Sequence, residues 1–357
     1  MGGISSADIA MLYSVLLGLI QSVFAGVPII QQYAAYIAVL IAIVLFFVVL
    51  SIVFSLYSYI FGWIERKMMA RVQSRHGPTY VGKWGVLQNL ADLIKLISKE
   101  NIIPDGADKY VFPFVIPALL AVFILMLYFI PFTPNFIGVN TSVALLVVFL
   151  LLSFTPLLGF LAGWTSGNKF SSIAAQRSVV MLLSYEIPIV LVMVAVAMMA
   201  GSYNLISIVQ AQQGGWYGLL MPIGLVVFFV ALLGEIDRPP FDLREADSEL
   251  IAGWLTDVSA PYYGLVLFLD YVRVLVGTTL VSVMFLGGWL GPSFLPPAAW
   301  LAIKVVLLTL FIIVIRATTV RMRIDRLLSL GWKYLMPLSV ANLLISFIIF
   351  IYVGVKL

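Results

Sequence analysis

The chain has 357 residues, of which 63% are hydrophobic and only 10% are charged. Soluble globular proteins carry about 25% charged residues and about half apolar ones, so this composition excludes an ordinary soluble domain. Apolar runs of about 20 residues, the length that crosses a bilayer as a helix, recur along the sequence. Barrel strands would instead alternate apolar and polar residues in segments of about 10, which the sequence does not show. It therefore predicts an all-α polytopic membrane protein.

Cysteine is absent from the sequence and histidine occurs once, at His76. Thiolate-held iron–sulfur clusters need four cysteines, and common haem ligation needs histidine or cysteine. A cysteine nucleophile is impossible, and a histidine-based triad could use only His76. The sequence also has no phosphate loop and no GxGxxG turn. If the chain serves electron transfer, we expect its partners to hold the redox centres.

Eight apolar segments are predicted to cross the membrane as helices. In chain order they lie near residues 37–63, 110–130, 142–166, 178–200, 219–236, 261–288, 300–317 and 334–354. A ninth stretch at 9–30 is long enough to span, but polar residues and a proline weaken it, and it could lie along the membrane instead. We thus expect one integral membrane domain over residues 1–357, with an eight-helix bundle at 37–354. Residues 1–36 would form an N-terminal extension or an extra helix.

The lysines and arginines are distributed very unevenly among the connections. None lies in the connections at residues 131–141, 201–218 and 289–299, and nearly all lie at 64–109, 167–177, 237–260 and 316–333. Positive charge is retained on the cytoplasmic side, so we expect the four basic connections to face the cytoplasm. The formal net charge of +4 follows from this topology and gives no reason to expect a nucleic-acid partner. Nearly all acids share these connections, which fits either solvated loops or a polar face that receives soluble partners.

The segment at residues 65–100 begins with charged residues at the end of a predicted span and continues beyond a Gly-Pro break. Residues 85–99 then predict an amphipathic helix, because their apolar residues recur at helical spacing. Asp92 and Lys95 lie off that apolar stripe. The simplest interpretation is an interfacial helix on the cytoplasmic leaflet.

Glu186 lies within an apolar run and is followed by Pro188. An ionisable group inside a span costs about 2.5–3.5 kcal/mol on insertion scales and is a functional-site hypothesis by default. The alternative is a glutamate that is hydrogen-bonded at a helix kink. Asp270 and Lys304 lie inside apolar runs in the same way.

Residues 234–254, GEIDRPPFDLREADSELIAGW, hold six of the sixteen acids of the chain. Two prolines stop the preceding helix, and residues 244–254 return to helical composition. In a helix, Glu245 and Glu249 would be i,i+4 neighbours whose like charges oppose each other. Close carboxylates raise one pKa, which suits a group that takes up and releases protons. The alternative is a solvated loop with incidental arginine pairs.

Together these segments resemble one family, the membrane subunit of respiratory complex I that is called the H subunit in bacteria and subunit 1 in mitochondria. Residues 65–100 match the family's ERK…GP..VG..GLLQ..AD..KL..KE run, and Gly163 to Glu186 match its GW.S..K(Y/F)…R…SYE pattern. Arg238 to Gly253 match its RxPFDLxEAExEL(V/I)AG run, and residues 285–289 match its FLGGW. Residues 315–337 match its IRAT…R.R.D.L…GWK…P pattern. The resemblance covers the chain after about residue 37. Similar subunits occur in F420H2 dehydrogenases and in ion-pumping membrane hydrogenases.

Four positions depart from the family pattern. Arg244 stands where a proline usually precedes the first acid of the EAE run, and the middle acid of that run is Asp247. The acids of the family's TEYS and AEY motifs are the shorter Asp257 and Asp270 here. Three of the four departures therefore keep the acid and shorten it by one methylene.

The resemblance implies a subunit of a proton-translocating quinone oxidoreductase in the plasma membrane of a prokaryote, with no catalytic or metal-binding residue in this chain. A lipid quinone would be the substrate, flavin and iron–sulfur clusters would lie on soluble-arm subunits, and other membrane-arm subunits would adjoin it. The implied quinone passage comprises Glu65, Arg66, Arg75, Asp92, Lys95 and Asp242. The implied proton relay comprises Glu186, Glu235, Glu245, Asp247, Glu249, Asp257 and Asp270.

We further expect Arg66 or Arg75 to pair with an acid of residues 234–249, because arginine binds carboxylates bidentately. The alternative is that both arginines only anchor their loop at the interface. A stand-alone ion-coupled transporter is the rival from another class, but such proteins often show inverted repeats and a midplane site, and no repeat is seen. A purely structural anchor would not need Glu186, Asp270 or Lys304 inside spans.

Overall fold

The computed structural model describes residues 34–245 and 247–354. Over these ranges the chain is helical and contains no strand beyond one isolated bridge between Thr133 and Phe136. Seven of the helices described are long and apolar enough to cross a membrane. The predicted all-α polytopic class is confirmed. The helices of the bundle are α3 (Ala34–Val72), α5 (Val111–Phe129), α6 (Ala144–Thr165), α7 (Lys169–Ala200), α10 (Pro222–Glu235), α12 (Ala260–Phe285), α13 (Pro297–Thr318), α14 (Ile324–Leu330) and α15 (Met336–Gly354).

Each of the eight predicted spans is a helix, but several helices continue beyond their apolar runs. α3 continues to Val72 and so carries Glu65 and Arg66 on a helix. α7 begins at Lys169, where the Asn168 side chain accepts a hydrogen bond from the Phe170 N–H and caps the helix. Apolar runs locate the membrane-embedded part of a helix and miss its polar ends. The candidate ninth span at 9–30 lies outside the described residues.

The helix α10 is the one predicted span that is too short for a bilayer. Its 14 residues extend for about 21 Å at 1.5 Å per residue, against a hydrocarbon core of about 30 Å. Two shorter helices precede it, α8 (Leu205–Ala211) and α9 (Tyr217–Leu220). α10 packs against α7, α12 and α15.

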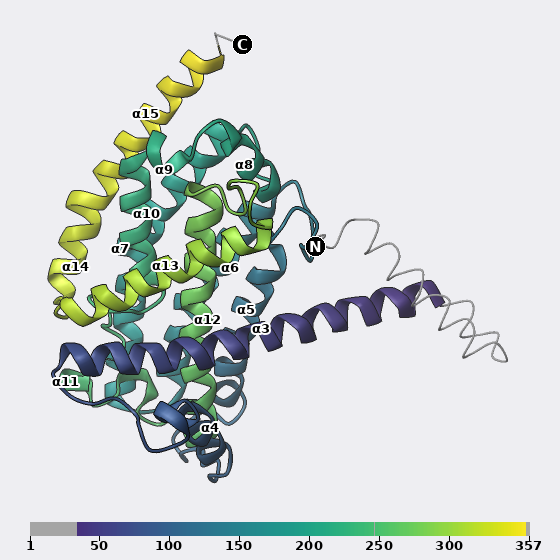
Figure 1. Cartoon of the computed structure of the whole chain (residues 1–357). Coiled ribbons are helices and arrows are strands. Elements are labelled where there is room, and N and C mark those ends of the chain that lie inside the picture. The colour runs from purple at the N-terminus through teal and green to yellow at the C-terminus, as the bar shows by residue number, and fades with distance from the viewer. Residues whose placement is uncertain (1–33, 246, 355–357) are drawn as a thin grey trace.

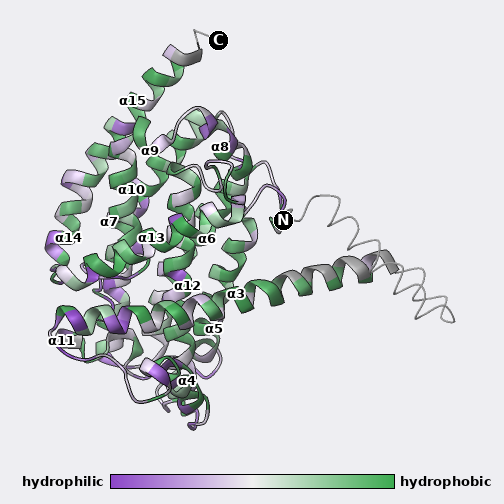
Figure 2. Ribbon diagram, viewed as in Figure 1, coloured by the Kyte–Doolittle hydropathy of each residue, from purple (hydrophilic) through white to green (hydrophobic). Residues whose placement is uncertain are grey.

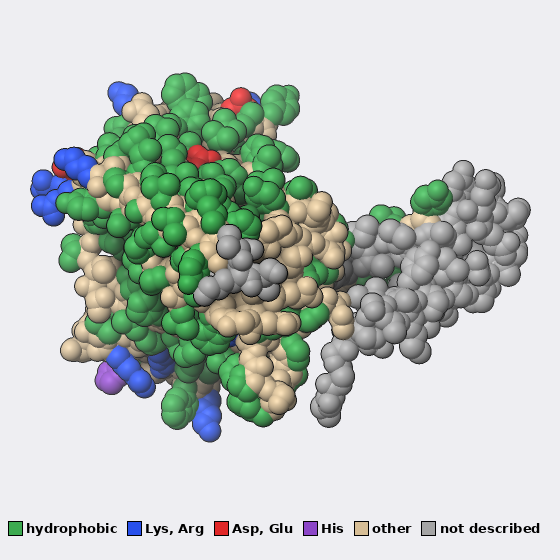
Figure 3. Space-filling model, turned by 90° about the horizontal axis from the view of Figure 1, so that it is seen from above, with side chains coloured by type: hydrophobic (Ala, Val, Ile, Leu, Met, Phe, Trp, Pro, Cys, Tyr) green, Lys and Arg blue, Asp and Glu red, His purple; other side chains and the backbone are tan. Residues whose placement is uncertain are grey.

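The helices pack as a bundle in which α6 lies between α5 and α7, and α12 contacts both α5 and α13. The 39-residue α3 packs on α12 and α13 near one end and extends away from the bundle at the other (Figure 1). Hydrophilic residues gather near α4 (Gln88–Ile97), α11 (Asp247–Leu250) and α14 (Figure 2). Apolar side chains cover much of the face in Figure 3, and Lys and Arg lie toward its left and lower edges. The long helices are hydrophobic along most of their length (Figure 2), which suits a bilayer as solvent.

The predicted amphipathic helix is observed as α4 (Gln88–Ile97). None of its residues is buried, and its apolar side chains Leu90, Ile94 and Ile97 are exposed. α4 packs on α3 and α12, and Asn89 Nδ2 donates to the Tyr59 carbonyl of α3 at 2.9 Å. Its exposed apolar stripe therefore lies beside the end of the long helix.

The helix predicted over residues 244–254 is wrong. Only the four-residue α11 (Asp247–Leu250) and the 3-10 turn η3 (Gly253–Leu255) form there. The backbone enters the left-handed region at Ile251 (φ 65°) and Gly253 (φ 56°), which ends a right-handed helix. A Cβ at residue 253 would lie 1.8 Å from the Arg244 carbonyl oxygen, so only glycine fits. Glu245 precedes α11, and the expected i,i+4 pair does not exist.

Candidate functional site

Glu65 on α3 is buried and bound by two arginines. Arg238 Nη1 donates to Glu65 Oε1 at 3.0 Å, and Arg316 of α13 donates to the same oxygen. Only 5% of Glu65 and 6% of Arg238 is exposed. A buried pair is retained only with good geometry, because desolvation of both charges is expensive. Glu65 thus joins α3, α13 and the connection that follows α10.

A small cavity borders this cluster between α3, α12 and α13. Its polar lining residues are Glu65, Arg238, Tyr271, Thr309 and Arg316, and its apolar ones are Phe61, Val274, Ile312 and Ile313. The ring of Tyr271 lies 5.3 Å from the Arg238 guanidinium carbon, within cation–π range. Charged and apolar residues therefore both border the cavity.

Asp237 forms the second centre of the network. Arg244 Nε donates to its Oδ1 at 2.6 Å, and Arg273 Nη1 of α12 donates to its Oδ2 at 2.5 Å. Arg244 is 1% exposed and Arg273 is not exposed at all. Two guanidinium groups share one carboxylate, so these three groups together carry a net positive charge. The arginines retain N–H groups, Nη1 of Arg244 and Nε and Nη2 of Arg273, that have no hydrogen-bond partner among the described residues.

Gly159 on α6 makes room for this network. A Cβ at residue 159 would lie 2.3 Å from Arg244 Nη1, well inside any real contact. The absence of a side chain there lets the Arg244 guanidinium reach α6 while it binds Asp237.

Glu235, at the end of α10, is 3% exposed, and its Oε1 has no hydrogen-bond partner among the described residues. The charges that act on it belong to Arg244, Asp237, Arg273 and Glu186. A buried polar atom without a partner is uncommon in native structures and calls for a water, an ion or a functional role. Glu235 is therefore coupled to the network by the electrostatic effect of the neighbouring charges, and its Oε1 makes no hydrogen bond to the network.

Two acids on the connection after α10 hold protons more tightly than usual. Burial, and then the charges of Asp270, Asp242 and Asp237, raise the pKa of Glu245 to about 8. Burial also raises the pKa of Asp242, although Arg321, with Nη2 at 3.5 Å from its Oδ2, opposes this. Both shifts follow from crowding carboxylates away from water.

The other acids of the predicted relay are held separately. Ser153 donates to Glu186 across α6 and α7. Asp257 accepts from Asn168 Nδ2 at 3.3 Å and from Ser171 Oγ at 3.4 Å. Glu249 is partly exposed and pairs with Arg177 at 2.6 Å. Asp270 is half-buried, and the charges of Arg238, Arg273 and Asp237 act on it. Asp247 begins α11, and its side chain lies outside the described part of the chain.

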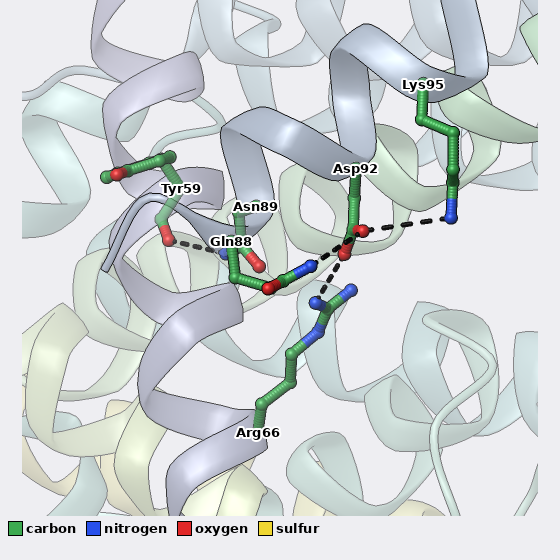
Figure 4. A network of polar contacts seen from close by, with 6 residues as sticks. All are labelled: Tyr59, Arg66, Gln88, Asn89, Asp92 and Lys95. Carbon is green, nitrogen blue, oxygen red and sulfur yellow. Dashed lines mark hydrogen bonds and ion pairs between the residues drawn. The ribbon is translucent and has the colours of Figure 1, made fainter. Parts of the chain in front are cut away.

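At the predicted quinone passage, Arg66 pairs with Asp92 and not with an acid of residues 234–249. Arg66 Nη1 lies 2.6 Å from Asp92 Oδ2, and Lys95 Nζ lies 3.8 Å from Oδ1 (Figure 4). Gln88 Nε2 donates to Oδ1 at 3.1 Å. Partial burial opposes ionisation of Asp92, but the bonds from Arg66 and Gln88 outweigh it and lower its pKa. These contacts tie α4 to α3.

The expected pairing of Arg66 or Arg75 with an acid of residues 234–249 is wrong. Arg66 binds Asp92, and Arg75 Nε donates to Gln73 Oε1 at 2.7 Å. Neighbouring residues on a helix point about 100° apart, so Glu65 faces the loop while Arg66 faces α4. The solvated-loop alternative is also wrong, because Asp237 and the arginines of the loop are buried.

The sequence interpretation missed five residues of the network: Asp237, Arg238, Arg244, Arg273 and Arg316. One of them carried a usable signal, because Arg273 lies in an apolar run in the same way as Asp270. The others lie among ordinary loop charges, and only the fold shows that they are buried.

These observations define a polytopic helical membrane protein whose connections bury a network of arginines and carboxylates at one end of the bundle. In the described part of the chain, no group of three or more histidine, aspartate or glutamate side chains could hold a metal ion. The chain belongs to the NADH dehydrogenase family, whose model matches residues 41–347.

Three relatives agree with this assignment. The H subunit of the NADH-quinone oxidoreductase of Dehalococcoides mccartyi strain CBDB1 is 42% identical over 287 residues, 80% of this chain and 81% of the relative. Its counterpart from the NADH-quinone oxidoreductase of Methylococcus capsulatus is 39% identical over 285 residues, 80% of this chain and 90% of the relative. The H subunit of the F(420)H(2) dehydrogenase of Methanosarcina mazei is 40% identical over 299 residues, 79% and 85% of the two chains. The resemblance found in the sequence motifs is confirmed.

Proposed function

We propose that this chain is the H-type membrane-arm subunit of a complex I-like quinone oxidoreductase and couples quinone reduction to proton translocation. The names of its relatives support this assignment, and so does a membrane bundle with a buried charge network. Because the chain has no cysteine and one histidine, iron–sulfur clusters belong to partner subunits of a soluble arm, and the family resemblance places flavin there as well. The M. mazei relative makes an F420H2 dehydrogenase the second candidate.

The basic connections face the cytoplasm of a prokaryotic cell in this proposal, because the opposite connections carry no lysine or arginine. The chain has no native cysteine, so single cysteines placed at Thr79 and Asn135 report on topology directly. A membrane-impermeant thiol reagent should label them from opposite sides, and labelling from one side would overturn this orientation.

The quinone passage is proposed at the cavity beside Glu65. A lipid quinone has an apolar tail and a polar head, and the cavity is bordered by both apolar and charged residues. α4 presents exposed apolar side chains beside the same end of α3, where a lipid molecule would leave the bilayer. The observation that carries the proposal is the Arg238–Glu65–Arg316 cluster, whose mutual pairing lets charged residues line a passage for a neutral ligand. Arg66, Asp92 and Lys95 would hold α4 against α3, and Asp242 would lie at the margin of the passage. Arg75, which bonds only Gln73 at an exposed position, is left out of the proposed passage.

The proton relay is proposed to start at the acids around Asp237. Quinone reduction consumes two protons, so it creates a charge demand beside the network. Glu245 titrates near neutral pH, with a pKa of about 8, and Glu235 is buried without a hydrogen-bond partner in the described residues. Groups with such shifted proton affinity are suited to take up and release protons. Glu186, Asp257, Asp270, Asp247 and Glu249 would continue or regulate the route.

The test uses the intact complex in liposomes, with quinone reduction and proton pumping measured together. Glu65→Gln should change the KM for quinone and the sensitivity to quinone-site inhibitors, because it removes the charge that two arginines bind. Glu235→Gln should lower the pumped protons per electron while assembly is kept. Glu100→Gln is the matched control, since Glu100 is exposed and lies outside both proposed sites. Unchanged quinone kinetics and pumping in assembled Glu65→Gln and Glu235→Gln complexes would contradict the proposal.

A further inference from the structure

Lys304 on α13 lies at the end of α12 that is opposite the charge network. α12 runs from the region of α4 to that of α8 (Figure 1), and it contacts both. Lys304 is 8% exposed. Its Nζ donates to the carbonyl oxygens of Leu286, Gly288 and Leu290 at 2.6, 2.9 and 2.7 Å. These carbonyls belong to the turn that follows α12.

The geometry fits the charged form of this lysine. Three acceptors need three N–H donors, which an ammonium has and a neutral amine lacks. The ring of Trp216 lies 4.9 Å from Nζ, a cation–π distance. No carboxylate of the described residues forms an ion pair with Lys304. The positive charge is therefore held by carbonyl dipoles at a helix C-terminus and by one aromatic ring, without a counter-ion.

The polar groups beside Lys304 are hydrogen-bonded, while Trp216 is 41% exposed. Gln212 Nε2 donates to the Val283 carbonyl at 2.9 Å, and its Oε1 accepts from the Gly287 N–H at 2.9 Å. Residues 280–285, the last part of α12, are all buried. Connections 131–141, 201–218 and 289–299, which adjoin this end, contain no charged residue. This end of α12 thus combines a buried apolar helix end with connections that carry no charge, and Lys304 is the one cation placed there among the described residues.

We propose that Lys304 is a fixed positive charge that closes this end of the bundle to protons. A proton that left the Asp237–Arg273 network along α12 would have to approach an uncompensated ammonium in a low-dielectric layer, where like charges repel strongly. Fixed cations and helix-dipole ends exclude protons and cations in other membrane pores by this effect. This role goes beyond coupling, because it concerns proton leak in the absence of turnover.

The test measures passive proton entry into liposomes that hold the intact complex and receive no electron donor. A pH step is imposed, valinomycin and potassium clamp the membrane potential, and an internal pH dye reports the leak. Lys304→Gln removes the charge and keeps two N–H donors, whereas Lys304→Arg keeps the charge. We expect several-fold faster leak in Lys304→Gln and wild-type leak in Lys304→Arg. Lys169→Gln, at an exposed lysine, is the matched control and should also match the wild type.

A second pair of variants leaves the lysine and its three carbonyl bonds in place. Trp216→Glu puts a carboxylate next to the ammonium, and Trp216→Gln is its neutral counterpart. We expect faster leak in Trp216→Glu than in Trp216→Gln. Wild-type leak in assembled Lys304→Gln, or equal leak in the two Trp216 variants, would overturn the proposal. Both measurements need neither quinone nor donor, so their failure is separate from a failure of the proposed coupling role.

Discussion

Arg238 and Glu65, which are 173 positions apart in the sequence, form a buried ion pair with a nitrogen–oxygen distance of 3.0 Å. The pair fastens the connection after α10 to the end of α3. Arg316 binds the same carboxylate from α13. Three segments that are distant in the chain therefore meet at one oxygen atom, next to the cavity proposed for quinone.

Removing one partner of this pair should destabilise the protein strongly. Arg238→Met leaves Glu65 buried with one arginine, and breaking a buried pair from one side costs about 3–5 kcal/mol. We expect a clear drop in the thermal stability of the purified complex, followed by loss of this chain from it. Glu249→Gln breaks a partly exposed pair, which is worth about 0–1 kcal/mol, and should leave the melting temperature nearly unchanged. Equal effects of the two substitutions would contradict the buried network.

Arg66 and Arg75 should differ in their effect on quinone kinetics. Arg66→Met breaks the ion pair that ties α4 to α3, whereas Arg75→Met loses only an exposed contact with Gln73. We expect Arg66→Met to alter the KM for quinone and inhibitor sensitivity, with electron delivery to the partner-held clusters intact. Arg75→Met should behave as the wild type. If Arg75→Met had the larger effect, α4 would not border the passage.

Glu245 should make stability depend on pH with a definite sign. Its pKa in the folded chain is about 8, against about 4.3 for an unperturbed glutamate. The folded state therefore holds the proton more tightly, and stability is lost as the pH rises toward the folded value. Glu245→Gln mimics the protonated form at every pH. The excess of its melting temperature over that of the wild type should grow as the pH rises toward about 8 and then level off; an excess that shrinks would reverse the assignment.

Gly159→Ala should displace Arg244 from Asp237. The added methyl group would lie 2.3 Å from Arg244 Nη1, so the guanidinium must move and its bonds to Asp237 weaken. We expect reduced coupled turnover in an assembled complex, and partial recovery when Arg244→Lys shortens the opposing side chain. Gly214→Ala is the matched control, because a Cβ there meets nothing within 4 Å. Wild-type turnover in Gly159→Ala would show that the position of Arg244 is unimportant.

The helices could be predicted from the sequence because a bilayer demands long apolar runs, and each of the eight runs contains a helix of the bundle. The shortness of α10 could not be predicted, because its apolar run begins in α9 and crosses the turn at Met221. The acids around residue 237 were recognisable as a cluster, and family motifs pointed to Glu65 and Glu235. The pairing of these acids with arginines could not be predicted, because Arg273 and Arg316 come from helices that follow the cluster in sequence. The position of Arg273 inside an apolar run marks it as unusual but does not name its partner. Which charge meets which is a property of packing across the bundle.

The shortness of α10 also has a consequence for how the chain is made. Segments of 14 residues fall below the range of about 17–25 that a spanning helix needs, so α10 is a poor candidate for insertion by itself. The backbone turn at Met221, just before α10, is tolerated at membrane depth only where other protein covers it. This part of the chain packs against α7, α12 and α15 through α10. α7 is synthesised before α10, but α12 and α15 follow it. Biogenesis of the centre of this bundle therefore has to be completed late, when the last helices reach the membrane and enclose α10.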